Sequence, residues 1–121
     1  ECEPVSLDEI VQHLGLERLT PDLHRNECEQ IRMAHAVESL SELLSQTEHG
    51  GMIITAHADM RILAAALLKH AAAVIFASGI RLGASVVKEA VAVGIPLYAT
   101  QESVFTIAGK LYGLGLRGCP A

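Results

Sequence analysis

The chain has 121 residues, of which 50% are hydrophobic, 19% are charged and 3% are aromatic, and its formal net charge is −5. This length suits one domain with a single core, and the apolar content is well above that of disordered segments. The negative charge and the lack of a Lys/Arg cluster argue against duplex nucleic acid and anionic membranes as partners. The scarcity of aromatic side chains argues against a stacking platform for single-stranded nucleic acid.

The sequence also indicates the compartment. The longest nearly uncharged run, Ala71 to Ile80, is too short to span a bilayer, and no secretory leader pattern opens the chain. The three cysteines, Cys2, Cys28 and Cys119, are odd in number and far apart, as is typical of free thiols in a reducing compartment. We therefore expect a soluble, cytoplasmic protein.

The first element predicted along the chain is a helix over residues 6–14. Ser6-Leu-Asp-Glu9 has the pattern of a capping box, and Gly15 marks the end of the helix. The apolar stripe behind the box consists of Leu7, Ile10, Val11 and Leu14. Residues 16–27 contain Thr20-Pro21 and mixed charges, which are typical of a surface connection, with room for a short extended piece near residues 16–19. Residues 1–29 are thus expected to form an N-terminal helix and a connection.

The middle of the chain predicts one strand and one short helix. Gln30 to Ala36 is predicted as a strand, and the wider region Leu16–Ala36 could supply one strand or two. Ser39-Leu-Ser-Glu42 repeats the capping-box pattern, and the leucines that follow predict a short helix to about Thr47. His49-Gly50-Gly51 ends it.

The remainder is a regular alternation of strands and helices. Apolar runs without polar alternation predict strands that are covered on both faces, at Met52–Thr55, Ala73–Ala77 and Ile95–Ala99. Each is followed by a helical pattern, at residues 59–70, 84–93 and 103–114. Strand–helix alternation with short links implies parallel strands. We therefore predict an α/β fold with a small, mostly parallel sheet flanked by helices, with strand–helix repeats over residues 30–115 of a single domain spanning 1–121.

Two helices carry signs of close packing. The helix over residues 59–70 is apolar nearly all round, so it either lies deep in the domain or contacts a second subunit. In so small a domain we favour the subunit, and predict a homodimer formed through residues 59–70. In the helix over residues 103–114, Gly109 and Gly113 indicate close packing against the sheet or against a twin subunit.

Ligands of an open parallel sheet collect at the carboxyl ends of its strands. The loops Thr55–Asp59, Ser78–Gly83 and Thr100–Ser103 would meet there, each before a helix N-terminus that favours anions. The Arg81 guanidinium suits a phosphate or carboxylate. The candidate residues for a small anionic ligand are Thr55, His57, Asp59, Ser78, Gly79, Arg81, Thr100 and Ser103. The alternative is that these are helix caps, turn glycines and a solvated arginine.

Catalytic and metal motifs are absent from the sequence. The six histidines include no H-E-x-x-H pattern and no close Cys–His pair. There is no P-loop, no G-x-G-x-x-G after a strand and no G-x-S-x-G elbow. We therefore predict no catalytic residue, no metal and no cofactor, and favour a protein that is not an enzyme; a small phosphatase or transferase is the third alternative after a regulatory domain and an assembly module.

Several segments resemble the DRTGG domain family. They are Ile53-Ile-Thr-Ala-His-Ala-Asp-Met-Arg-Ile-Leu-Ala-Ala-Ala66, Ala73-Val-Ile-Phe-Ala-Ser-Gly79, Gly94-Ile-Pro-Leu-Tyr-Ala-Thr100 and Ser103-Val-Phe-Thr-Ile-Ala-Gly109. That family is similar to the N-terminal domain of HPr kinase/phosphorylase. The resemblance implies a non-catalytic regulatory domain, often dimeric, and with the strand-end loops it favours sensing of a small phosphorylated or nucleotide ligand. The alternative it implies is an assembly module with no small ligand, for example one linked to hydrogenase or redox systems.

Overall fold

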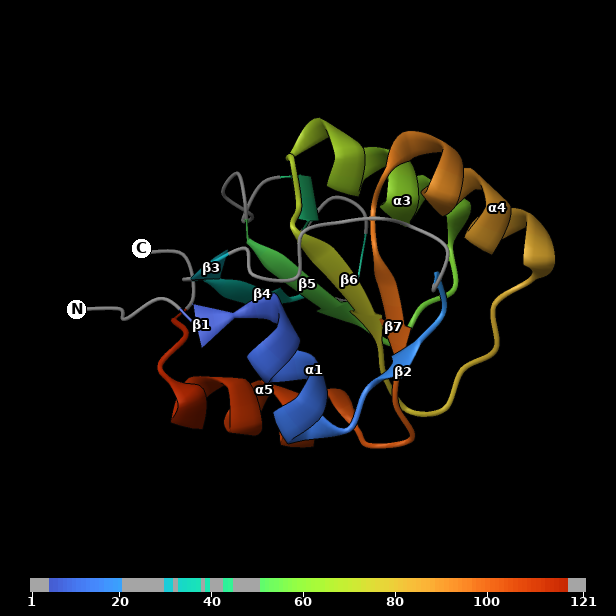
Figure 1. Ribbon diagram of the computed structural model, residues 1–121. Coiled ribbons are helices and arrows are strands. Elements are labelled where there is room, and N and C mark those ends of the chain that lie inside the picture. Colours follow the sequence, from blue (N-terminus) through green and yellow to red (C-terminus); the bar gives the residue numbers. More distant parts are fainter. Residues whose placement is uncertain are drawn as a thin grey trace.

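A five-stranded sheet forms the centre of the structure, a computed structural model that describes residues 5–20, 30–31, 33–37, 39, 43–44 and 51–117. The strand order is β2-β7-β6-β5-β4 (Figure 1). The strands are β2 Glu17–Arg18, β4 Ala34–Ala36, β5 Met52–Thr55, β6 Ala73–Phe76 and β7 Leu97–Ala99. β4, β5, β6 and β7 run parallel, and β2 is antiparallel to β7. The predicted mostly parallel α/β sheet is confirmed.

Helices cover both faces of this sheet. They are α1 Leu7–Leu14, α3 Met60–Leu68, α4 Ala84–Val93 and α5 Val104–Leu114. α1 and α5 lie on one face, and α3 and α4 lie on the other (Figure 1). On β5, Ile54 packs in the α1/α5 layer and Ile53 in the α3/α4 layer, and both are buried. The apolar runs therefore lack polar alternation because neither face of the sheet meets water.

The predicted ends of the first helix are confirmed by its caps. Ser6 Oγ accepts a hydrogen bond of 3.2 Å from the backbone N–H of Glu9, and Gly15 follows α1 with φ +64°. That left-handed conformation is easy for glycine and ends the helix. The predicted helix 59–70 is shorter than expected, because Asp59 is its cap and the chain leaves the helix after Leu68.

The single strand predicted over residues 30–36 is wrong. The chain forms two strands in different sheets: β3 Gln30–Ile31 pairs with β1 Val5–Ser6, and β4 pairs with β5. Ile31 is buried beside Val5 in the α1 layer, whereas Ala34–Ala36 runs along β5. Each piece is thus bound to a different neighbour.

The extended piece expected near residues 16–19 is present as β2. Its partner β7 holds it through two further hydrogen bonds beyond the ladder. Leu19 N–H donates to the Leu97 carbonyl at 2.9 Å, and Leu97 N–H donates to the buried Thr20 Oγ1 at 3.2 Å. Of the helix predicted over Ser39–Thr47, residues 43–44 are helical, while most of that segment and residues 21–29 lie outside the described residues.

Of the two alternatives for Gly109 and Gly113, packing against the sheet is wrong, and packing against a twin subunit stays a prediction. Both glycines lie on the exposed side of α5, and a Cβ added at either would meet nothing within 4 Å. The glycines are therefore not required by contacts within the described part of the chain. None of the helices described here is long and apolar enough to cross a membrane.

Candidate functional site

A cleft of about 770 Å³ opens at the carboxyl ends of β6 and β7. One wall is the β6–α4 loop with Gly79 and Arg81, and a second is the β7–α5 loop with Thr100 and Glu102. The third wall comes from the turn between α1 and β2, because β2 pairs with β7 and places Glu17 directly opposite Ala99. This volume is in the range of small-molecule sites.

Backbone hydrogen bonds join the first two walls. Ser78 N–H donates to the Glu102 carbonyl at 2.7 Å, and Gly79 N–H donates to the Thr100 carbonyl at 2.9 Å. Both donors have left-handed backbone, with φ +64° at Ser78 and +68° at Gly79. Glycine suits this position because of the left-handed conformation; a Cβ on Gly79 would lie 2.5 Å from Oε1 of the exposed Gln101 side chain, which can move aside. The two loops therefore form one fixed unit.

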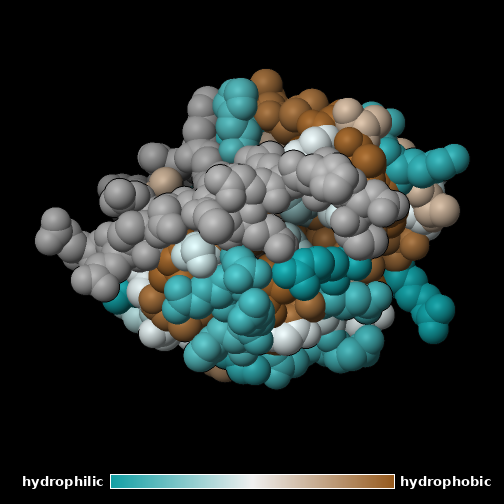
Figure 2. Space-filling view, viewed as in Figure 1, coloured by the Kyte–Doolittle hydropathy of each residue, from teal (hydrophilic) through white to brown (hydrophobic). Residues whose placement is uncertain are grey.

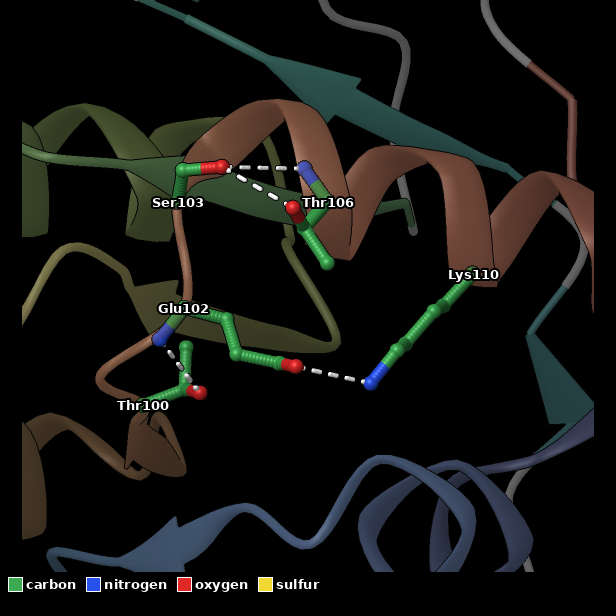
Figure 3. A network of polar contacts seen from close by, with 5 residues as sticks. All are labelled: Thr100, Glu102, Ser103, Thr106 and Lys110. Atoms are coloured by element: carbon green, nitrogen blue, oxygen red, sulfur yellow. Dashed lines mark hydrogen bonds and ion pairs between the residues drawn. The ribbon is translucent and has the colours of Figure 1, made fainter.

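The charged groups of the cleft differ in their partners. Lys110 Nζ, in the second turn of α5, lies 2.9 Å from each carboxylate oxygen of Glu102 (Figure 3). Arg81 is exposed and makes no ion pair with any residue in the described ranges. Since an unpaired guanidinium is well suited to bidentate binding of phosphate or carboxylate, Arg81 is the group in the cleft most available to an anion.

Apolar side chains complete the lining beside these charges. Leu19 reaches the cleft from the end of β2, and Ile80, Leu82 and Val87 reach it from the β6–α4 loop and the start of α4. The N-cap of α4 is Gly83, which provides no side-chain hydrogen bond to the first turn. The cleft thus combines one available cation with an aliphatic wall, which suits a ligand with an anionic end and a less polar end.

The loop after β5 has a different organisation. Thr55 is fully buried, and its Oγ1 accepts a hydrogen bond of 3.2 Å from the backbone N–H of His57. Asp59 caps α3 and pairs with Arg61, with 2.9 Å between Oδ2 and Nη2. Hydrogen bonds from the Arg61 side chain and then from its backbone hold the pKa of the Asp59 carboxyl below its usual value. These groups are engaged in local structure and do not line the cleft.

The structure therefore places only some of the eight predicted ligand residues in the cleft lining. The cleft lining includes Gly79, Arg81 and Thr100. Ser78 joins the two loops through its backbone, and Ser103 caps α5 by accepting from Thr106 N–H at 3.2 Å (Figure 3). Thr55, His57 and Asp59 belong to the neighbouring loop.

Sequence reasoning did not single out Glu17, Glu102 or Lys110. Glu102 lies inside the predicted Thr100–Ser103 loop, and this position was the signal in the sequence that could have identified it. Its pairing with Lys110 spans eight residues and crosses the start of a helix, so the usual three- or four-residue spacing of helical ion pairs could not reveal it. Within the described ranges, no group of three or more His, Cys, Asp or Glu side chains is placed to hold a metal ion.

Comparison with known proteins bears on the fold. No protein-family model matches the chain, and no curated protein matches it. A similar solved structure is the crystal structure of the CBS and DRTGG domains of the regulatory region of Clostridium perfringens pyrophosphatase, complexed with the activator diadenosine tetraphosphate. The TM-score is 0.67 at 19% sequence identity, over 86% of this chain and 44% of that one.

At this identity the likeness concerns the fold alone. The chain has a mixed α/β fold similar to that of a regulatory region with DRTGG and CBS domains, which supports the fold expected from the resemblance. It spans less than half of the length of that regulatory region.

Proposed function

We propose that this chain is a non-catalytic regulatory domain of the DRTGG type that binds a small phosphorylated ligand, such as a nucleotide, in the cleft beside Arg81. The observation that carries the proposal is an exposed guanidinium with no ion pair in the described ranges, placed in a cleft at the carboxyl ends of two parallel strands. Ligands of open α/β sheets gather at this edge.

Three further features support the proposal. The β6–α4 loop, which carries Arg81, is fixed to the β7–α5 loop by backbone hydrogen bonds, so binding would require little ordering of the protein. The aliphatic wall of Ile80, Leu82 and Val87 offers a surface for a nucleobase or another apolar group. The similar regulatory region of the pyrophosphatase was crystallised with a nucleotide activator.

In this proposal the ligand residues are Gly79, Arg81 and Thr100, with Ser78 and Ser103 shaping the two loops. Thr55, His57 and Asp59 would affect the ligand site indirectly, because the hydrogen bond of 2.9 Å from Ala77 N–H to the Thr55 carbonyl joins the end of β5 to the start of the β6–α4 loop. We further propose that residues 1–121 form one domain, similar to the N-terminal domain of HPr kinase/phosphorylase, in the cytoplasm.

Isothermal titration calorimetry with adenosine diphosphate tests the ligand site. Binding to the wild-type chain should be lost or strongly weakened by Arg81→Ala, because the anion loses its cation. Lys88→Ala is the matched control, since Lys88 is an exposed cation on α4 outside the cleft lining. Equal binding by the wild-type chain and Arg81→Ala, or no binding of phosphorylated compounds by the wild-type chain, would contradict the proposal.

A second candidate function, an assembly module, is favoured by the outer surface of α3 and α4. Apolar side chains gather over these helices at the top of the view in Figure 2, and Met60, Leu67 and Leu68 are 45%, 44% and 66% exposed. Between the helices lies an apolar groove of about 250 Å³ that includes Leu63 and Val93. We propose that a homodimer forms through α3 at this surface, since exposed apolar patches mark interaction sites.

Light scattering on the purified chain tests this second function. The wild-type chain should have the mass of a dimer, and Leu68→Glu should shift it to a monomer without loss of helical content. Phe105→Ser is the matched control, because Phe105 is 89% exposed on α5, on the opposite face of the sheet. A monomeric wild-type chain at all concentrations rules out this assembly.

A further inference from the structure

Two cations line the cleft, but they are not equally available. Arg81 makes no ion pair with the residues described, whereas the Lys110 ammonium is bound by both oxygens of Glu102 at 2.9 Å. Among the residues that the structure describes, Glu17 is the remaining charged side chain of the lining. With Arg81 and Lys110 positive and Glu17 and Glu102 negative, the formal charge of this described lining is zero. An incoming anion therefore meets one available cation and one that is already engaged.

The backbone of Glu102 is fixed, but its side chain has room to move. The Glu102 carbonyl accepts from Ser78 N–H at 2.7 Å, and its N–H donates to Thr100 Oγ1 at 3.2 Å (Figure 3). The side chains of Glu102 and Lys110 remain 39% and 43% exposed. Ion pairs exposed to this extent are weak, so a stronger anion can replace the carboxylate.

From these contacts we propose that Lys110 is a second anion-binding cation of the cleft, which Glu102 occupies until a ligand displaces the Glu102 carboxylate. The site therefore selects ligands with two or more linked phosphate groups. This inference rests on the proposed function of the cleft. A single phosphate is satisfied by Arg81 and leaves the Glu102–Lys110 pair intact. A second phosphate gains Lys110 by displacing Glu102, because a phosphate group carries more negative charge and more acceptor oxygens than one carboxylate.

Glu102 acts in this scheme as a specificity-determining residue. Its carboxylate competes with the ligand for Lys110, so it reduces the affinity of every ligand that must displace it. Removing the charge while keeping the shape, in Glu102→Gln, should therefore strengthen the binding of a diphosphate. This is the opposite of the effect expected if Glu102 contacted the ligand directly as a hydrogen-bond acceptor.

Calorimetric titration of adenosine monophosphate and adenosine diphosphate into the full chain tests the inference. The wild-type chain should prefer the diphosphate. Lys110→Met should remove this preference, because it weakens the diphosphate more than the monophosphate, and Glu102→Gln should tighten the diphosphate by roughly two- to fivefold, the range expected for loss of an exposed competing ion pair. Lys88→Met, on α4 and outside the cleft, should change neither affinity. Circular dichroism of each variant checks that the fold is retained.

The possible results separate this inference from the proposed function. If Arg81→Ala weakens the binding of both nucleotides but Lys110→Met leaves the ratio of their affinities unchanged, the role of Lys110 as a second cation is disproved and the anion site at Arg81 stands. If Glu102→Gln weakens the diphosphate, Glu102 is a direct ligand contact and the inference is overturned. If the wild-type chain binds neither nucleotide nor inorganic pyrophosphate, the proposed function fails and this inference fails with it.

Discussion

The backbone N–H of Ser78 donates a hydrogen bond of 2.7 Å to the carbonyl oxygen of Glu102, and so fixes the loop after β6 to the loop after β7. Ser78 adopts a left-handed conformation, with φ +64°, that is unusual for a residue with a side chain. The structure tolerates this strain where the two loops meet. The walls of the cleft are therefore set before any ligand binds.

Replacing Gly79 tests whether the junction between the two loops requires left-handed backbone at this position. Gly79→Ala should lower the free energy of unfolding by about 1–2 kcal/mol, because alanine is strained in left-handed backbone. The new Cβ would also press on the Gln101 side chain, which is 2.5 Å from its position. Urea denaturation of the wild-type chain and the variant measures the change. An unchanged midpoint would show that the loop conformation is not required.

Gly109 provides the matched substitution with the opposite expected sign. Gly109→Ala should raise the free energy of unfolding by about 0.5–1 kcal/mol, because alanine loses less conformational entropy than glycine in a helix interior and the Cβ meets open space. The same urea experiment measures it. A destabilised variant would contradict the open surface and indicate that another chain packs closely on α5.

A buried hydroxyl contributes to the attachment of β2. Thr20 Oγ1 accepts from Leu97 N–H at 3.2 Å. Thr20→Val keeps the shape but leaves that N–H without its acceptor, which should cost about 1–3 kcal/mol of stability. Thr20→Ser retains an oxygen and should cost less. Equal losses in the two variants, measured by thermal or urea unfolding, would show that the hydroxyl is not the source of the stability.

The Asp59–Arg61 pair gives stability a dependence on pH. The pKa of Asp59 is lowered in the folded chain by hydrogen bonds from Arg61, so its contribution is fully present above the unfolded-state pKa of about 3.9 and is lost as the pH falls through the lower folded-state pKa. Asp59→Asn keeps a capping side chain without the charge. The difference in stability between wild type and variant should shrink between about pH 6 and about pH 3. A constant difference over that range would disprove the lowered pKa.

Much of the fold was predictable because its signals are local. The capping box at Ser6 and the apolar run Met52–Thr55 report on their own segments, and both elements are confirmed. β3 and β4 were merged in the prediction because strands of two and three residues are too short to show a period. The two strands can be distinguished only by the strands with which they pair, β1 and β5.

Part of the candidate site was also predictable from the sequence. Thr100 follows β7 directly, Arg81 lies in the loop after β6, and the carboxyl ends of neighbouring parallel strands lie at the same edge of a sheet. Glu17 reaches the cleft only because β2 adds antiparallel to β7, and Lys110 only because α5 passes beside the β7–α5 loop. Those placements depend on tertiary pairing, which no short motif encodes.

The most direct test of an anion site beside Arg81 is a map of the residues that respond to a ligand. Backbone amide shifts should be followed by nuclear magnetic resonance while adenosine diphosphate is added to the isotopically labelled chain. The largest changes should fall in residues 79–82 and 100–102 and in the turn at residues 14–19, with little change at residues 57–61. Saturable changes confined to residues 57–61, or no saturable change anywhere, would contradict the assignment of the cleft.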